Sequence, residues 1–374
     1  MWFFRSPRIV FGEDSLSFLS MLESRRFLIV TDRYLAGTGI LEKVRASLPQ
    51  GAETMVFSKI GPEPLLSEIT SDMDSIYRFK PEIIIGLGGG SSIDAAKIIY
   101  ALYEKPGLSA YDITPMDNFA FGLKSKLIAI PTTSGTGSEC SWAAVFSDDR
   151  EKRKNEVASP EILPDYAILD PDLVINLPRE QTVNTAVDAI THAVESFVSQ
   201  WNNYYSDMLA EKALSLIVPN LTKVLLDPHD VASREFVHIG ASMAGLSFSN
   251  SQIGLAHALG HAMGACFSIP HGKTVGLYLP EVVKYNYKKA GQRYDHLNSL
   301  FPEGFRSKTL DLTLKNYFKA LGQPVKIGDI PISRQDYERR LPDMIELASQ
   351  STGVLTNPEE SDSKSISELI LSVI

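Results

Sequence analysis

The sequence predicts an α/β domain followed by an all-helical domain. In the first half, short β-branched apolar runs alternate with helical stretches, which is typical of a buried parallel sheet with helices on its faces. After about residue 180, helical periodicity dominates and no convincing strand pattern remains. A chain of 374 residues is also long for one hydrophobic core. We therefore predict two domains, residues 1–178 and residues 179–374.

Four apolar runs predict the strands of the first domain, because each is continuous and ends at polar or glycine residues. They are FLIVTD (27–32), EIIIGLG (82–88), KLIAIPTT (126–133) and DYAILDP (165–171). Helical periodicity predicts the elements of the second domain at 181–200, 205–226, 233–250 and 257–267. A short helix, SKSISELILSVI, is expected at 363–374.

Composition and charge exclude several classes of function. The chain is 44% hydrophobic and 22% charged, which is ordinary for a globular protein. Its net charge of -9 repels nucleic-acid phosphates, so we expect no nucleic-acid partner. No apolar run approaches the length of a membrane helix, and MWFFRSPRIVFG lacks the pattern of a signal peptide. The only cysteines, Cys140 and Cys266, do not suggest a disulfide framework, so we expect a cytoplasmic protein.

Five residues of the second half form a candidate metal site: Asp188, His192, His257, His261 and His271. The first two are four residues apart, as are His257 and His261, so each pair lies on one helix face. A carboxylate with imidazoles suits a divalent transition metal and leaves a coordination position open for substrate. A lone histidine on an apolar face is more often a core residue. Two such pairs and a further histidine among small, apolar neighbours favour a metal.

A glycine-rich turn after the second predicted strand indicates a dinucleotide site. GLGGGSSIDAAK (86–97) places three glycines, at 88–90, just before a helix. Glycines allow close backbone approach, and the positive N-terminus of a helix favours a diphosphate. Ser91 and Ser92 are candidate caps, whereas Asp94 either caps the helix or contacts a ribose or a nicotinamide amide. The spacing differs from GxGxxG, so we expect a different type of dinucleotide site.

Two further segments extend the predicted cofactor site. Asp32 ends the strand LIVTD, where a carboxylate binds an adenosine ribose and repels a 2′-phosphate, which favours NAD over NADP. A turn cap is an equally consistent role for Asp32. The loop PTTSGTGSE (131–139) supplies hydroxyl groups suited to a ribose or a diphosphate, at Thr132, Thr133, Ser134 and Thr136.

Taken together, these motifs resemble those of the iron-dependent (group III) alcohol dehydrogenase family. The resemblance covers nearly the whole chain and includes LIVTD, GGGSSIDAAK, IPTTSGTGSE, EKRKNEVASPEILPDYAILDP, AVDAITHAVE and AGLSFSNSQIGLAHALGHAMGACFSIPHG. It implies a Rossmann-like dinucleotide-binding domain followed by an all-α metal-binding domain, an architecture like that of dehydroquinate synthase, and a homo-oligomer. The chain departs from the family at Glu359, where many members carry an arginine after Asn-Pro.

The resemblance also implies a role for each candidate residue. The metal ligands become Asp188, His192, His257 and His271, whereas His261 stays unliganded beside the nicotinamide and the substrate and transfers the proton. The residues implied to contact the cofactor are Gly89, Gly90, Ser91 and Asp94 at the diphosphate and nicotinamide side, Thr132, Thr133 and Thr136 at its middle, and Asp32 at its adenosine ribose. Phe248 matches a family position that lines the substrate pocket, and Trp142 and Ala143 follow the second cofactor loop; ordinary core packing is the alternative for all three.

The expected activity is the interconversion of an alcohol and its aldehyde by hydride transfer to NAD, with NADP as the alternative cofactor. Fe²⁺, or Zn²⁺ as the alternative, supplies Lewis acidity that lowers the pKa of the alcohol. No Lys or Arg adjoins the ligands, so a small neutral alcohol or diol such as 1,3-propanediol is expected. Glycerol or lactaldehyde/propanediol oxidoreduction is the alternative within the family. An NAD-dependent lyase like dehydroquinate synthase, or a non-catalytic sensor, is the alternative outside it.

Overall fold

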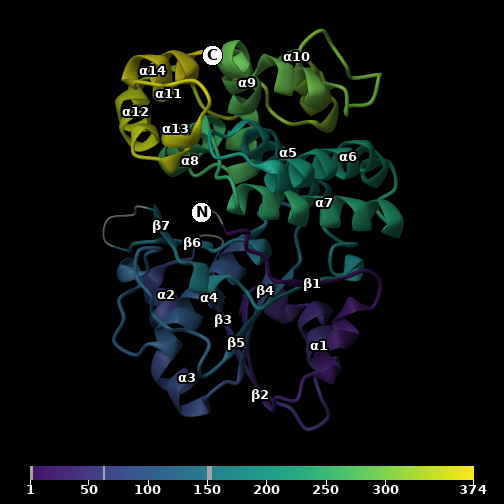
Figure 1. Ribbon diagram of the computed structural model, residues 1–374, viewed down its shortest axis with the longest axis vertical. Coiled ribbons are helices and arrows are strands. Elements are labelled where there is room, and N and C mark those ends of the chain that lie inside the picture. The colour runs from purple at the N-terminus through teal and green to yellow at the C-terminus, as the bar shows by residue number, and fades with distance from the viewer. Residues whose placement is uncertain (1–2, 62–63, 150–153) are drawn as a thin grey trace. The chain divides into compact units, whose positions relative to one another are not determined.

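The computed structural model describes residues 3–61, 64–149 and 154–374. Within it the chain divides into two compact units, Met1–Asn176 and Leu177–Ile374 (Figure 1). The start of the motif EKRKNEVASPEILPDYAILDP, residues 151–153, lies outside the described residues, as do residues 1–2 of the N-terminal segment. The prediction of domains that meet at residue 178 stays a prediction, because compactness does not show that either unit folds alone.

The first unit contains a six-stranded parallel sheet in the order β1-β8-β5-β4-β2-β3. The strands are β1 (Arg8–Phe11), β2 (Arg26–Asp32), β3 (Glu53–Ile60), β4 (Ile83–Gly88), β5 (Lys126–Pro131) and β8 (Tyr166–Leu169). The four predicted runs correspond to β2, β4, β5 and β8, and the predicted α/β class is confirmed. β1 and β3 were not predicted.

Both faces of this sheet are covered, which explains why its central strands are apolar without alternation. Leu28 and Val30 of β2 belong to one hydrophobic cluster, together with buried residues of α4 (Gly90–Glu104). Phe27 and Ile29 belong to the opposite cluster, together with buried residues of α1 (Gly39–Ala46). Figure 1 shows these helices beside the strands of the first unit.

The order of the strands places the predicted cofactor residues at one position of the sheet. After β2 the chain adds β3 on one side, and then crosses to the other side of β2 to add β4. The carboxyl ends of β2 and β4 therefore flank a topological switch point, where open α/β sheets bind their ligands. Gly88 at the end of β4 pairs with Pro131 at the end of β5, so the glycine turn and the hydroxyl-rich loop leave adjacent strands.

An antiparallel hairpin, β6 (Ala143–Ser147) with β7 (Lys154–Ala158), packs its first strand against α4. It was not predicted from the sequence.

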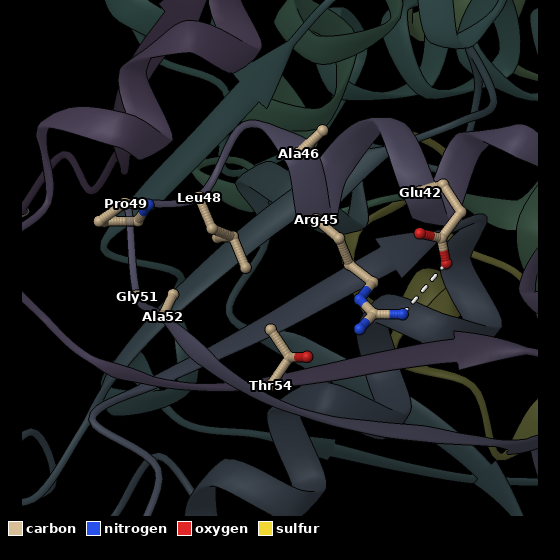
Figure 2. Close-up of a pocket in the computed structure, with 8 residues that line it drawn as sticks. All are labelled: Glu42, Arg45, Ala46, Leu48, Pro49, Gly51, Ala52 and Thr54. Carbon is tan, nitrogen blue, oxygen red and sulfur yellow. Dashed lines mark hydrogen bonds and ion pairs between the residues drawn. The ribbon is translucent and has the colours of Figure 1, made fainter.

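A surface hollow of about 340 Å³ lies between the end of α1 and the start of β3, at the edge of the large sheet where its strands begin. Figure 2 shows its lining residues, with Arg45 paired to Glu42 at 3.1 Å. None of the predicted cofactor residues lines this hollow.

The regular elements of the second unit are all helices within its described residues. Its longer helices are α5 (Arg179–Val198), α6 (Tyr204–Leu226), α7 (Val231–Ser249), α8 (Leu255–Phe267), α9 (His271–Asn298) and α10 (Leu310–Leu321); shorter ones are α11 (Arg334–Arg339), α12 (Leu341–Ser349), α13 (Thr352–Thr356) and α14 (Ser363–Leu371). α5 packs against α6, α7 and α9 and is buried along most of its length. In the described part of the chain, no helix has both the length and the apolar composition needed to cross a membrane.

Candidate metal centre and nucleotide loops

The buried helix α5 carries two of the predicted metal ligands on one face. Asp188 is 2% exposed and His192, one turn later, is 5% exposed. His257, on α8, is 1% exposed. Ligand atoms of these three residues all lie within 4.8 Å of one another. The structure therefore brings together residues that are far apart in the sequence and that are individually unusual in a hydrophobic core.

Three imidazole nitrogens converge on one carboxylate oxygen. The Nε2 atoms of His192, His257 and His271 lie 3.8, 3.4 and 3.2 Å from Oδ1 of Asp188. A four-coordinate ion with bonds of about 2.1 Å holds its ligand atoms roughly 3.4 Å apart, so these distances suit such an ion. Neither Asp188 Oδ1 nor His257 Nε2 has a hydrogen-bond partner among the described residues, although both atoms are buried. Buried polar atoms rarely lack a partner, and a cation bound at this point would provide one for both. The residues present fit a divalent transition metal.

His271 reaches this group because α9 approaches α5 closely. It is the first residue of α9, after Pro270, and its side chain is 34% exposed. The next residue is Gly272, where a Cβ atom would collide with the backbone carbonyl of Asn184 on α5. Glycine at this position therefore allows the first turn of α9 to lie against α5, one turn before Asp188.

Glu195 is a buried carboxylate at this site that was not predicted from the sequence. It lies on α5, three residues after His192, and is 3% exposed. It accepts hydrogen bonds from the backbone N–H groups of Gly254 (2.9 Å) and Ala256 (2.5 Å), and its Oε2 lies 2.5 Å from His257 Nδ1. Its spacing from His192 on one helix face is the sequence signal that could have identified it.

The carboxylates make this site electrostatically favourable for a cation. Burial alone lowers the pKa of His257, but Glu195 and Asp188 outweigh this effect and raise that pKa to about 9. Burial also opposes ionisation of Asp188, yet the neighbouring histidines hold its pKa well below the usual range. Two carboxylates among several imidazoles therefore stabilise positive charge, whether it arrives as a proton or as a metal ion.

Two further predicted residues of the second unit lie at the same group. The ring of His261 on α8 is 5.9 Å from the ring of His257 and 4.8 Å from that of His271. On α7, the ring of Phe248 stacks on His192 with a centroid distance of 4.3 Å. An apolar ring thus covers one predicted ligand, His192, and the ring of His261 lies beside another, His271.

The glycine turn and the hydroxyl-rich loop touch each other in the first unit. Gly88 has a φ of 145°, a conformation that L side chains rarely adopt. A Cβ atom on Gly90 would lie 3.0 Å from the side chain of Thr136, and one on Gly89 would lie 3.5 Å from Thr133. The backbone N–H of Thr132 donates to the carbonyl of Gly88 at 3.0 Å. A side chain is therefore strained at Gly88 and crowded at Gly90, whereas at Gly89 a Cβ atom would make ordinary contact.

The N-terminus of α4 differs from the expectation that Ser91 and Ser92 cap it. Gly89 is the N-cap residue and no described side chain caps the helix, because both serines lie inside its first turn. Such a helix end offers backbone N–H groups and a positive dipole to an anion. The uncapped turn therefore has the chemistry that a diphosphate requires.

Both predicted carboxylates of the first unit make hydrogen bonds within the protein. Asp94 accepts from Ser138 Oγ at 2.5 Å and from the backbone N–H of Val145 at 3.0 Å. Asp32 accepts from the backbone N–H of Leu35 at 2.8 Å, which is the turn-capping role considered from the sequence. Their contacts with a cofactor stay predictions. So do the substrate roles of Trp142 and Ala143, which lie at the start of the β6–β7 hairpin.

Comparison with known proteins identifies the class of this protein. Residues 6–171 match the family model described as iron-containing alcohol dehydrogenase, and residues 182–374 match the C-terminal model of the Fe-containing alcohol dehydrogenase family. The protein is therefore an oxidoreductase of the alcohol dehydrogenase class. The chain belongs to the iron-containing alcohol dehydrogenase family, and the resemblance seen in the sequence motifs is confirmed.

Individual relatives agree with this assignment. The chain is 32% identical over 372 residues to 1-propanol dehydrogenase PduQ of Salmonella typhimurium, covering 97% of both proteins. It is 31% identical to an NADPH-dependent butanol dehydrogenase of Clostridium saccharobutylicum, covering 96% of this chain and 94% of that protein. A crystal structure of 1,3-propanediol oxidoreductase superposes with a TM-score of 0.90 at 27% identity and covers 100% of both chains.

Proposed function

We propose that this protein interconverts a small neutral primary alcohol or diol and its aldehyde, with a nicotinamide dinucleotide as the hydride carrier and Asp188, His192, His257 and His271 as the metal ligands. The observation that carries this proposal is the convergence of three imidazole Nε2 atoms within 3.8 Å of Asp188 Oδ1. Membership of the iron-containing family supports Fe²⁺ as the ion. Zn²⁺ suits the same set of donors and remains the alternative.

The ion would supply Lewis acidity that lowers the pKa of a substrate hydroxyl group. The protein's part is to present a fixed set of donors and to limit the competing reactions. Burial of His257, His192 and Asp188 keeps water away from these three donors. The stacked ring of Phe248 adds an apolar surface beside His192, suited to the carbon chain of a short alcohol.

His261 is proposed to carry the alcohol proton away from the site. Its ring lies beside those of His257 and His271, and its side chain is partly exposed, so it can pass a proton outward directly or through water. In this proposal His261 is the catalytic residue that is not a metal ligand.

The dinucleotide is proposed to bind at the carboxyl ends of β2, β4 and β5. Gly89, Gly90 and Ser91 would face its diphosphate at the uncapped start of α4, with Asp94 toward the nicotinamide side. Thr132, Thr133 and Thr136 would contact its middle. Asp32 would accept hydrogen bonds from the adenosine ribose and repel a 2′-phosphate, so we propose NAD over NADP.

The charge around the metal ligands favours a neutral substrate. Lys273, two residues after His271, is paired with Glu180 at 2.6 Å, so its charge is already compensated. We propose 1,3-propanediol or a similar short primary alcohol. The likeness to proteins named for 1-propanol and 1,3-propanediol supports this choice. Glycerol and lactaldehyde/propanediol are the alternatives within the same chemistry.

An anaerobic activity screen tests the proposal. The chelated protein is reloaded with Fe²⁺ or Zn²⁺ and assayed with NAD⁺ or NADP⁺ against C2–C4 alcohols, diols, glycerol and a phosphorylated alcohol. We expect the fastest NADH formation with Fe²⁺, NAD⁺ and a short neutral alcohol. Tight NAD binding without net NADH formation from any alcohol would instead support the lyase-like alternative.

A further inference from the structure

We infer that Glu195 is a positioning residue for the metal site: it fixes the orientation and the tautomer of His257 so that Nε2 of that ring presents its lone pair to the ion. This inference rests on the proposed metal site. It assigns a role to a side chain that is not itself a ligand in that proposal. The hydrogen-bond contacts of Glu195 are the observations that support the inference.

The carboxylate of Glu195 is surrounded by hydrogen-bond donors from one turn of α8. Its Oε1 accepts the backbone N–H of Ala256, and its Oε2 accepts the backbone N–H of Gly254 and faces Nδ1 of His257. A buried carboxylate is costly unless N–H groups compensate it. The N-terminal turn of a helix has unsatisfied N–H groups and a positive dipole, so it provides that compensation. Glu195 is thus held in place without any contribution from a metal.

The donors around Glu195 determine which nitrogen of His257 carries the proton. Backbone N–H groups only donate, and an ionised carboxylate only accepts. The short contact between Glu195 Oε2 and His257 Nδ1, at 2.5 Å, therefore requires hydrogen on Nδ1. A histidine that binds a metal is neutral and has a single N–H, so with that hydrogen on Nδ1 its Nε2 has the lone pair for the ion. Nε2 is the atom that lies 3.4 Å from Asp188 Oδ1.

This arrangement couples two ligand-bearing helices. α5 supplies Asp188 and His192 as ligands, and its next polar side chain on the same face orients the ligand that α8 supplies. Carboxylates that accept the second N–H of a metal-bound histidine raise its basicity and fix its ring orientation. Gly254 makes the contact feasible, because a Cβ atom there would lie 2.9 Å from Glu195 Oε1.

The side chain must be a carboxylate of this length, because both of its oxygens face N–H donors. A glutamine would place an NH₂ group against N–H donors at one of its two positions, because only one end of an amide accepts. An alanine would leave the Nδ1–H group of His257 and two backbone N–H groups buried without acceptors. Both substitutions should therefore loosen the ring of His257 while they leave all four ligands in the chain.

The test measures metal binding rather than turnover. Full-length wild type, Glu195→Gln and Glu195→Ala are stripped of metal and titrated with Co²⁺ and, separately, with Zn²⁺. The readouts are the dissociation constant and the visible d–d spectrum of bound Co²⁺, with far-UV circular dichroism to verify folding. Glu346→Gln is the control, because Glu346 lies on α12 of the same unit, is exposed and is not a ligand.

We expect both Glu195 variants to bind metal about 10- to 100-fold more weakly than wild type and to shift the Co²⁺ spectrum. The control should stay within about twofold. Unchanged affinity and an unchanged spectrum in Glu195→Gln, with only a lower melting temperature, would show that Glu195 merely caps α8 and would overturn the inference. Failure of wild type to bind either ion at all would overturn the proposed metal site as well, so the two failures are distinguishable.

A measurement on wild type covers the case in which both variants fail to fold. In zinc-loaded protein with ¹⁵N-labelled histidine, the inference requires His257 to be protonated at Nδ1, with that proton protected from exchange. Protonation of His257 at Nε2 instead, or a freely exchanging Nδ1 proton, contradicts it.

Discussion

Nζ of Lys97 lies 3.7 Å from Oδ1 of Asp94, one turn earlier on α4. The lysine is fully buried and donates to Ser138 Oγ, Ser141 Oγ and the carbonyl of Ala143. Burial lowers the pKa of Lys97 and raises that of Asp94, and each charge partly offsets the effect on the other. The pair therefore ties the helix at the predicted diphosphate site to the segment that follows the hydroxyl-rich loop.

Lys97→Met should lower the free energy of unfolding by about 3 kcal/mol, because it leaves the Asp94 carboxyl group without its compensating cation in a largely buried position. Adding Asp94→Asn should recover part of this loss. Urea denaturation of the single and double variants measures the coupling. Strictly additive changes in the free energy of unfolding would contradict the coupling between Lys97 and Asp94. Lys105→Met, at the exposed C-cap of α4, serves as the control.

His257→Ala should lose metal and activity together. The substitution removes a buried donor nitrogen from the group around Asp188 and leaves Glu195 without the imidazole that it faces. Metal content after anaerobic loading and dialysis, measured by mass spectrometry, is the check. His229→Ala is a control, because that histidine is exposed and lies outside the group. A variant that retains stoichiometric metal would remove His257 from the ligand set.

His261→Ala should keep its metal but turn over about 10²- to 10⁴-fold more slowly, the usual contribution of a positioned acid–base group. The physical reason is that the ring lies beside those of His257 and His271 and is not one of the four proposed ligands. kcat and metal content are measured on the same preparation. Wild-type kcat in this variant would end the proposed proton-transfer role, whereas loss of metal would make His261 a ligand.

Gly272→Ala should weaken metal binding strongly and destabilise the second unit by about 1–3 kcal/mol, because the added methyl group collides with the carbonyl of Asn184 and pushes His271 away from Asp188. Gly264→Ala, in α8, is the matched control: its nearest neighbour would lie at an ordinary 3.6 Å. Thermal melts with and without Zn²⁺ measure both effects. If Gly272→Ala and Gly264→Ala had equally small effects on metal binding and melting temperature, α9 would be able to shift away from α5 without cost.

The stability of the second unit should fall between pH 7 and pH 5 because of His238. Burial lowers the pKa of this histidine from 6.5 to about 4, so the unfolded chain takes up the proton first as the pH falls. Its contribution is complete above the unfolded pKa and is lost as the pH drops toward 4. The loss at pH 5 amounts to about 2 kcal/mol. Denaturant unfolding at several pH values should show a shallower slope for His238→Gln than for wild type.

The central strands and longer helices could be predicted from the sequence because their patterns are strong. β4 is apolar and buried at every position, and α5 has clear helical periodicity. β1 and β3 were not predicted because they are partly exposed strands at the edges of the sheet and contain both polar and apolar residues. The β6 and β7 strands were not predicted because the sequence between them contains no Asn-Gly or Asp-Gly pair, the usual signal of a hairpin.

Candidate site residues could be named from the sequence, but their partners could not. Helical spacing relates Asp188 to His192 because both lie on one helix. The contact of Glu195 with Gly254 and Ala256 depends on how α5 and α8 pack, which no local pattern encodes. Spacing also paired His257 with His261, whereas in the structure His257 shares Asp188 with His271, at the start of the next helix.

The proposed ligands come from three different helices, α5, α8 and α9. An unfolded chain cannot hold them together, so an ion that binds them binds only the native state and adds its binding free energy to folding. At a thousandfold excess over the dissociation constant, this linkage contributes about 4 kcal/mol. The ion would then stabilise the helical unit. The iron supply in the cell would therefore determine how long the folded protein persists as well as how fast it turns over its substrate.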